Sequence, residues 1–324
     1  MKSVPAFSLP KRLSIFAVAV FAFAEISSAA SKQKSHPQFE ALPLTRSGQN
    51  HLLVRAQVNG RSAVLLVDSG APATLIDSRR RSDFKLAGVG NNPELPTSVL
   101  INGVADKLAI VHSLRLGALD IVDIPVVVAN VSSPHRVARM LREQQIDGIL
   151  GVDVLFGTKA VMDCQDQVLI LNMFPEAGAR DPQLDLRGFH KMPIYVNDGF
   201  NLFVNSSVNG TRARLLVDTG AVMTTLHLPF VRQLRIPYYE TAFTSSGVNR
   251  KGDAVNVAEI KRLSVGSVNM SGKAIGVADL KWLFDGKRRS SLTSPPVVGL
   301  LGAEVLKSHH AIIDFGTRTL YLKE

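Results

Sequence analysis

The fold of this 324-residue chain is decided by the stretch Val58-Asn-Gly-Arg-Ser-Ala-Val-Leu-Leu-Val-Asp-Ser-Gly-Ala71. The chain repeats it later as Val208-Asn-Gly-Thr-Arg-Ala-Arg-Leu-Leu-Val-Asp-Thr-Gly-Ala221. Asp68 and Asp218 occupy the same position in the two copies. Because a duplicated unit places equivalent residues in equivalent surroundings, these two carboxylates are candidates to face each other.

The repeat extends well beyond this stretch. Phe39 matches Phe189 at the same offset. A second shared motif follows in each half, namely Gly148-Ile-Leu-Gly-Val-Asp-Val-Leu155 and Gly299-Leu-Leu-Gly-Ala-Glu-Val-Leu306. Self-similarity on this scale is typical of a duplicated structural unit. The sequence therefore predicts two units, residues 39–173 and residues 189–324, joined by a linker at residues 174–188 that contains Pro, Gly and several charges.

Each copy presents its aspartate at the end of a predicted strand. The apolar runs Val64-Leu-Leu-Val67 and Leu215-Leu-Val217 are typical of buried strands. Asp-Ser-Gly or Asp-Thr-Gly then ends each run, and glycine lets the main chain approach closely. Main-chain N–H groups that reach the carboxylate favour its ionised form. One such turn is common at strand ends, but two in register within a repeat indicate a shared role.

The composition favours a mostly β fold with few short helices. Apolar residues make up 46% of the chain and aromatic residues only 6%, and short valine-rich runs lie between glycines. Residues 134–146 have a helical pattern, and residues 278–284 are predicted to form a shorter counterpart. Glycine-rich segments at residues 88–110 and 244–252 predict a mobile hairpin in each half. An ordinary surface hairpin would fit the same spacing.

Residues 1–30 are predicted to be a secretory signal peptide. Positively charged residues precede the apolar run at residues 13–24, and small residues follow it. This run is shorter than the roughly 20 residues that a membrane-spanning helix needs. We therefore expect cleavage, no integral membrane span afterwards, and an exported protein that is periplasmic or extracellular, with residues 31–38 as a flexible arm.

The single cysteine, Cys164, excludes an internal disulfide. A lone thiol on an apolar strand is more typical of a small buried hydrophobe than of a nucleophile. The histidines His190, His227 and His309-His310 do not form a metal-ligand spacing together with acidic residues. We therefore expect neither a metal nor another cofactor.

The charge is basic, with 37 Lys and Arg against 27 Asp and Glu, a net charge of +10. It is scattered, apart from the clusters at residues 79–81 and 287–289, and aromatic residues do not interleave with it. This pattern indicates a solvated surface and no nucleic-acid partner. A competing hypothesis from the same charge is a protein that binds anionic envelope material.

The repeated motifs resemble those of the retropepsin-like and pepsin-like aspartic proteases. Asp68-Ser-Gly-Ala and Asp218-Thr-Gly-Ala match the Asp-Thr/Ser-Gly-Ala loop of that family. Ile149-Leu-Gly151 and Leu300-Leu-Gly302 match its later hydrophobic-hydrophobic-Gly element. The resemblance covers nearly all of the chain after the predicted signal peptide. It implies two tandem retropepsin-like β-barrel lobes that form a bilobal pseudo-dimer with a central cleft, in a chain that works as a monomer.

The same resemblance implies roles for individual residues. Asp68 and Asp218 would be the catalytic pair of an aspartic endopeptidase, sharing one proton and activating one water. Supporting residues of the two loops would be Ser69, Gly70, Ala71, Thr219, Gly220 and Ala221. Gly103 and Gly247 would lie in flaps that hold an extended polypeptide substrate by strand addition.

Some positions depart from the family pattern. Pro72 and Val222 are apolar where the family often has a small polar residue, and Glu304 stands where the first half has Asp153. Neither predicted flap has a clear tyrosine. An alternative interpretation is therefore a weak or inactive aspartic-protease fold that acts as a peptide-binding or envelope-associated module.

Overall fold

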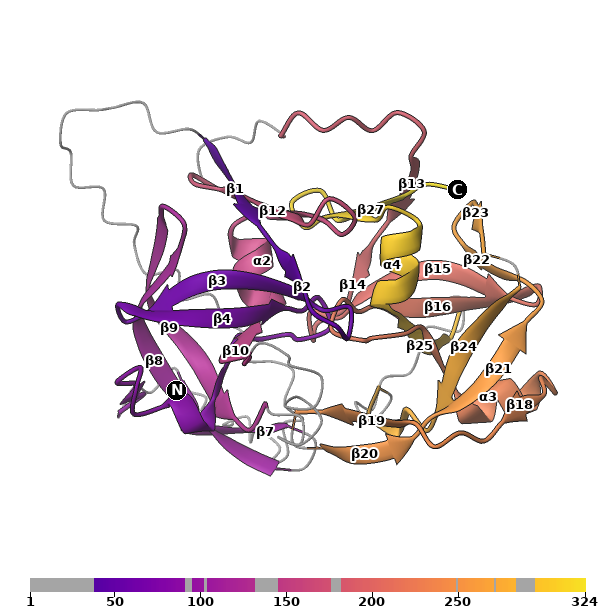
Figure 1. Cartoon of the computed structure of the whole chain (residues 1–324), viewed down its shortest axis with the longest axis horizontal. Helices are drawn as coiled ribbons and strands as arrows, with labels where there is room; N and C mark the ends of the chain where they lie inside the picture. The colour runs from indigo at the N-terminus through magenta and orange to yellow at the C-terminus, as the bar shows by residue number, and fades with distance from the viewer. Residues whose placement is uncertain are drawn as a thin grey trace, which may run out of the picture.

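The computed structural model describes residues 38–90, 95–101, 104–131, 145–175, 182–248, 250–270, 272–283 and 295–324. The predicted signal peptide lies outside these residues, as do nearly all of the predicted arm and most of the predicted helix at residues 134–146. Figure 1 shows two β-rich lobes side by side, the first from the N-terminal half and the second from the C-terminal half. The prediction of a mostly β chain with two tandem lobes is confirmed.

The first lobe is built on a nine-stranded sheet in the order β2-β3-β4-β10-β5-β9-β8-β6, with β7 paired to β8. Its strands are β2 Thr45–Arg46, β3 Leu52–Val58, β4 Arg61–Val67, β5 Leu75–Asp77, β6 Ala87–Gly88, β7 Ser98–Ile101, β8 Val104–Leu116, β9 Leu119–Ala129 and β10 Gly148–Leu150. The late strand β10 lies between β4 and β5, parallel to β4 and antiparallel to β5. The chain between β4 and β5 must therefore cross the end of β10, and this crossing segment carries Asp68.

The second lobe repeats this arrangement in a ten-stranded sheet in the order β18-β21-β24-β17-β25-β16-β15-β22-β23, with β14 paired to β15. Its strands are β14 Tyr195–Val196, β15 Leu202–Val208, β16 Thr211–Val217, β17 Thr225–His227, β18 Tyr238–Tyr239, β21 Asn256–Ile260, β22 Leu263–Val265, β23 Val268–Asn269, β24 Lys273–Ala278 and β25 Val297–Leu301. A separate hairpin consists of β19 Thr244–Gly247 and β20 Arg250–Ala254. In this lobe β25 separates β16 from β17, so the segment carrying Asp218 crosses the end of β25.

A third sheet is shared by the two halves of the chain and has the order β1-β12-β11-β26-β27-β13. Its strands are β1 Phe39–Pro43, β11 Val161–Asp163, β12 Val168–Asn172, β13 His190–Pro193, β26 Ile312–Asp314 and β27 Thr319–Leu322. The halves meet where β11 pairs with β26, with Met162 opposite Ile313. In Figure 1 this sheet lies above both lobes. Strand pairing thus makes the two halves one body.

Helices are short in the described residues. They are α2 Val152–Gly157, α3 Leu228–Gln233 and α4 Ala303–Ser308, with 3₁₀ turns η1 Ser78–Arg80 and η2 Lys281–Leu283. Of the short helix predicted over residues 278–284, the described residues contain only the 3₁₀ turn η2, Lys281–Leu283. Strand β24 continues to Ala278, because Ile275 and Val277 alternate into the core next to β17, and only η2 follows.

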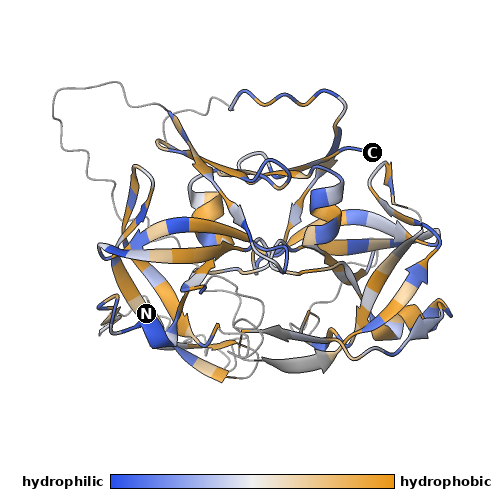
Figure 2. Cartoon of the chain, in the orientation of Figure 1, coloured by the Kyte–Doolittle hydropathy of each residue, from blue (hydrophilic) through white to orange (hydrophobic). Residues whose placement is uncertain are grey.

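One apolar core runs through both lobes and the shared sheet. It includes Val54 and Leu65 from the first lobe, Leu215 from the second, and Met162 and Leu320 from the shared sheet, all nearly or fully buried. Figure 2 shows apolar residues alternating with polar ones along the strands, as expected where one face of a sheet is buried. In the part of the chain that the structure describes, no helix has the length and apolarity to cross a membrane.

Candidate active site

The two aspartates meet where the two lobes face each other. The main-chain N–H of Asp68 donates to the Leu150 carbonyl of β10 at 3.0 Å, and that of Asp218 donates to the Leu301 carbonyl of β25 at 3.1 Å. Each carboxyl group then lies against the glycine of the other loop. A Cβ atom added at Gly70 would stand 2.6 Å from Cγ of Asp218, and one added at Gly220 would collide with the carboxyl group of Asp68. Only glycine fits in these two positions.

Four hydrogen bonds between the lobes hold the two loops together. The Ser69 N–H donates to Thr219 Oγ1 at 3.0 Å, and the Thr219 N–H donates to Ser69 Oγ at 3.1 Å. Each hydroxyl then donates to a carbonyl of the opposite strand, Ser69 to Val217 and Thr219 to Val67, both at 2.8 Å. Both side chains are buried. The arrangement is symmetric, so each loop fixes the other.

Main-chain amides reach both carboxyl groups. The Gly70 N–H donates to Asp68 Oδ1 at 2.7 Å. On the other side, the N–H groups of Gly220 and Ala221 donate to Asp218 Oδ1 at 3.0 and 2.9 Å. The predicted supporting residues are therefore all present in the two loops, although they serve different purposes: the hydroxyls join the loops and the amides bind the carboxyls.

The two carboxyl groups hold protons more tightly than an ordinary aspartic acid. Burial raises the pKa of Asp68, although amide hydrogen bonds from Gly70, Gly220 and Ala221 and a hydrogen bond to Asp218 oppose the rise. Burial and the nearby Asp68 charge raise the pKa of Asp218 much further. Because the two carboxyls influence each other's protonation, they titrate as one unit.

A threonine and an acid anchor each loop from behind. In the first lobe, Thr74 donates to Asp153 through its N–H at 2.9 Å and its hydroxyl at 2.8 Å. In the second lobe, the Thr224 N–H donates to Glu304 Oε1 at 2.7 Å. Glu304 Oε2 is buried and has no hydrogen-bond partner among the described residues. The longer acid therefore makes a less complete anchor than the aspartate that it replaces.

The two hairpins predicted as flaps are present, but only part of each is described. Gly103 lies outside the described residues, between β7 and β8, whereas Gly247 is the last residue of β19 and pairs with Arg250. Val248, at the tip of the second hairpin, packs against an apolar cluster of the first lobe that contains Ala71 and Leu75. In Figure 1 this hairpin lies on the side opposite the shared six-stranded sheet. The second-lobe hairpin thus reaches the first lobe.

Comparison with protein families identifies the family of this chain. A family model described as aspartyl protease matches the chain twice, over residues 54–154 and residues 204–305. The chain belongs to the aspartyl protease family. The two matched regions contain the Asp68 and Asp218 loops, so each lobe is one copy of the family unit, and the tandem resemblance read from the sequence is confirmed. No curated protein matches the chain significantly.

Two other acids that the repeat duplicates lie away from the dyad of this aspartyl protease. Asp163 accepts the N–H groups of Gln165 and Asp166 at 2.9 and 2.8 Å, and Asp314 accepts that of Thr317 at 2.9 Å. Both belong to turns that follow β11 and β26 in the shared sheet. They have the hydrogen bonding of turn carboxylates, as the sequence indicates.

No motif in the sequence singles out His51, which is partly buried. Burial lowers the pKa of its imidazole, and the main chain of Gly220 opposes this shift. Comparison of the two copies of the repeat shows one difference here, because the position that matches His51 in the second half is Asn201. The two halves therefore differ in a titratable side chain at this position.

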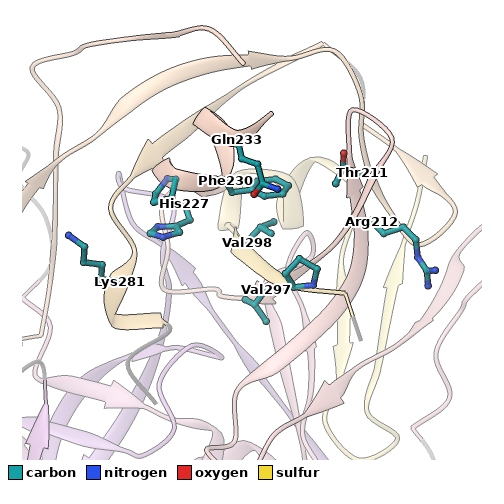
Figure 3. Close-up of a pocket in the computed structure, with 10 residues that line it drawn as sticks. Thr211, Arg212, His227, Phe230, Gln233, Lys281, Val297 and Val298 are labelled. Atoms are coloured by element: carbon teal, nitrogen blue, oxygen red, sulfur yellow. The ribbon is translucent and has the colours of Figure 1, made fainter. Parts of the chain in front are cut away.

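A separate cavity of about 530 Å³ lies in the second lobe (Figure 3). Its lining residues are Thr211, Arg212, His227, Pro229, Phe230, Gln233, Lys281, Pro296, Val297 and Val298. Thr211 begins β16 and Asp218 follows its end, so the cavity is roughly 20 Å from the dyad along an extended strand. In the first lobe of this aspartyl protease, Arg80 forms ion pairs with Asp147 and Asp83 at the corresponding end of β4.

Proposed function

We propose that this chain is an aspartic endopeptidase in which Asp68 and Asp218 hydrolyse a peptide bond with one bound water. The observation that carries the proposal is the interlocked dyad. Asp218 is buried and Asp68 is partly buried, the pKa values of both carboxyls are raised, and each carboxyl lies against the glycine of the opposite loop. A perturbed, coupled pair of acids at the meeting point of two lobes is typical of a catalytic centre.

The pair has complementary roles in this proposal. Ionised Asp68 accepts a proton from the water as its oxygen attacks the carbonyl carbon of the substrate. Protonated Asp218 donates its proton to the carbonyl oxygen and stabilises the tetrahedral intermediate. When that intermediate breaks down, the C–N bond cleaves and the leaving nitrogen takes up a proton from the dyad. The amides of Gly70, Gly220 and Ala221 hold both carboxyls in position during these transfers.

The substrate in this proposal is an extended polypeptide. Hairpin β19–β20 offers main-chain groups that an extended chain pairs with by strand addition, and its tip residue Val248 packs against an apolar cluster of the first lobe. The predicted signal peptide supports a further proposal, that the protein acts outside the cytoplasm. Fractionation of cells that express the full chain, with N-terminal sequencing of the product, tests export; a cytoplasmic, uncleaved product would contradict it.

Removing either carboxylate tests the proposed chemistry. Asp68→Asn and Asp218→Asn should each reduce peptide cleavage by roughly 10⁴-fold or more, and the double variant should be little worse, because groups that act as one unit are strongly non-additive. Turnover of a peptide library by the purified chain measures this. Asp163→Asn is the matched control, since its turn keeps an acceptor oxygen, and it should retain most activity. A folded Asp218→Asn protein with near wild-type cleavage would contradict the proposal.

A further inference from the structure

We propose that the cavity of about 530 Å³ in the second lobe is a binding site for a small apolar carboxylic acid. The cavity lies at the end of the lobe where β16 begins, whereas Asp218 follows the other end of that strand. The inference therefore goes beyond the proposed function and does not depend on it. Small-molecule sites commonly have volumes of roughly 300–1,000 Å³, so the cavity is large enough for such a ligand.

One part of the lining is apolar. Phe230 and Val298 are buried and line the cavity together with Pro229, Pro296 and Val297. Figure 3 shows Phe230, Val297 and Val298 around the same space. Water leaves such a surface when an apolar group covers it, and this release favours binding. We therefore expect the body of the ligand to be apolar.

The charged part of the lining is positive. Arg212 and Lys281 lie on opposite sides of the cavity in Figure 3. Lys281 pairs with Asp279 at 2.6 Å, and Arg212 is exposed. Within the part of the chain that the structure describes, the lining contains no aspartate or glutamate. Thr211 and Gln233 add a hydroxyl and an amide, both of which can donate hydrogen bonds. An anionic head group complements this lining.

His227 also lines the cavity, and it is neutral. Its Nδ1 accepts the main-chain N–H of Leu280 at 3.0 Å. A ring nitrogen that accepts a hydrogen bond carries no proton, so the proton of this ring is on Nε2, which is a donor. Burial lowers the pKa of the imidazole, in agreement with the neutral ring. The histidine therefore adds a donor and no negative charge to the lining.

The first lobe supplies an internal comparison. The residues that match Phe230 and Val298 in the repeat are Arg80 and Asp147. These two form an ion pair, with Arg80 Nε at 3.0 Å from Asp147 Oδ1. The hollow at this place in the first lobe is lined by the polar residues Arg61, Ser62, Arg80, Ser82, Asp83 and Lys85. Apolar walls at this place therefore belong to the second lobe only and are not required by the fold that the lobes share.

Calorimetric titration of the full chain with 3-phenylpropionate tests the inference. This probe has an apolar ring and one carboxylate, and 3-phenylpropionamide is the matched probe without the charge. The wild type should bind the acid, and it should bind the amide about twofold to fivefold more weakly, the effect of one exposed ion pair. Asp68→Asn should bind the acid as the wild type does, because the cavity is separate from the dyad. Loss of cleavage in that variant therefore tests the proposed function without affecting this measurement.

Variants that copy the first lobe locate the site. Phe230→Arg combined with Val298→Asp introduces the first-lobe ion pair into the cavity and should abolish binding of the acid. Arg212→Ser, which copies Ser62, changes only an exposed side chain and should weaken binding about twofold to fivefold. Arg61→Ala, at the matching place in the first lobe, is the control and should bind as the wild type does. Thermal unfolding shows whether each variant is folded.

Four results would overturn the inference. They are a wild-type chain that does not bind 3-phenylpropionate at millimolar concentration, equal binding of the acid and the amide, equal weakening by Arg212→Ser and Arg61→Ala, and undiminished binding in the folded double variant. A peptide end is a different occupant with the same carboxylate. Acetylated alanyl-phenylalanine represents it, and binding of this dipeptide without binding of 3-phenylpropionate would also overturn the assignment to a small acid.

Discussion

The two catalytic candidates are chemically unequal although the repeat makes them equivalent in sequence. Burial raises the pKa of both carboxyls, and the negative charge of Asp68 raises that of Asp218 further. Burying a carboxylate is unfavourable unless it is neutralised or hydrogen-bonded. The dyad therefore carries a cost in stability that increases when both groups are forced to ionise.

This inequality predicts how stability changes with pH. A raised folded pKa means that the folded state binds its proton more tightly than the unfolded state does. Asp218 thus contributes stability below its ordinary pKa near 3.8, and that contribution is lost as pH rises toward its raised value. Asp218→Asn removes the titration, so it should be more stable than the wild type at neutral pH and should lose this advantage near pH 3. Urea unfolding at several pH values measures the difference. A variant less stable than the wild type at every pH would contradict burial and the Asp68 charge as its cause.

At the scale of elements, the dyad loops are held by the starts of α2 and α4. Asp153 lies in the first turn of α2 and Glu304 in the first turn of α4. Asp153 binds both polar groups of Thr74, whereas one oxygen of Glu304 is buried without a partner among the described residues. The acid at this position of the fold therefore has more complete hydrogen bonding in the first lobe than in the second.

Truncating these two acids should reveal the difference. Asp153→Ala leaves the buried Thr74 N–H and hydroxyl without their acceptor, which costs about 1–3 kcal/mol of unfolding free energy. Glu304→Ala removes one acceptor but also a buried oxygen that has no partner among the described residues. The decrease in unfolding free energy should therefore be smaller for Glu304→Ala than for Asp153→Ala. Glu304→Asp, which copies the first lobe, should be close to neutral. Chemical denaturation compares the three, and equal losses for the two alanine variants would count against the argument.

At the scale of the whole molecule, the halves are joined by the hydroxyl pair Ser69 and Thr219 and by the sheet in which β11 pairs with β26, in addition to apolar packing. Each of the two family units in this chain supplies one aspartate. In this chain both loops are provided by one molecule. The six-stranded sheet adds main-chain pairing between the halves that dissociation would have to break.

We therefore predict that one chain is sufficient for activity. Specific activity should stay constant on dilution, and sedimentation should give the mass of a single chain. Mixing Asp68→Asn with Asp218→Asn should restore nothing, because each molecule keeps its own incomplete dyad. A dimeric mass, or recovery of activity in the mixture, would mean that the active pair forms between chains.

The sequence alone determined the architecture. Two copies of an Asp-Ser/Thr-Gly-Ala loop, each followed by a hydrophobic-hydrophobic-Gly element, predicted the tandem β lobes and the family, because strands, turns and glycines carry their preferences locally. A repeat also predicts which residues are equivalent, so it identified Asp68 and Asp218 as a candidate pair. Local pattern placed the start of the helix predicted over residues 278–284 too early, because pairing with β17 holds Ala278 extended as the end of β24.

The tertiary structure alone decided which residues join the lobes asymmetrically. Val248 of the second hairpin packs against an apolar cluster of the first lobe. This contact leaves no periodicity or motif, since its partners lie in the other half of the chain. The raised pKa of Asp218 also depends on the tertiary structure. Burial and the charge of Asp68 cause it, and both arise only when the two loops are brought together by folding.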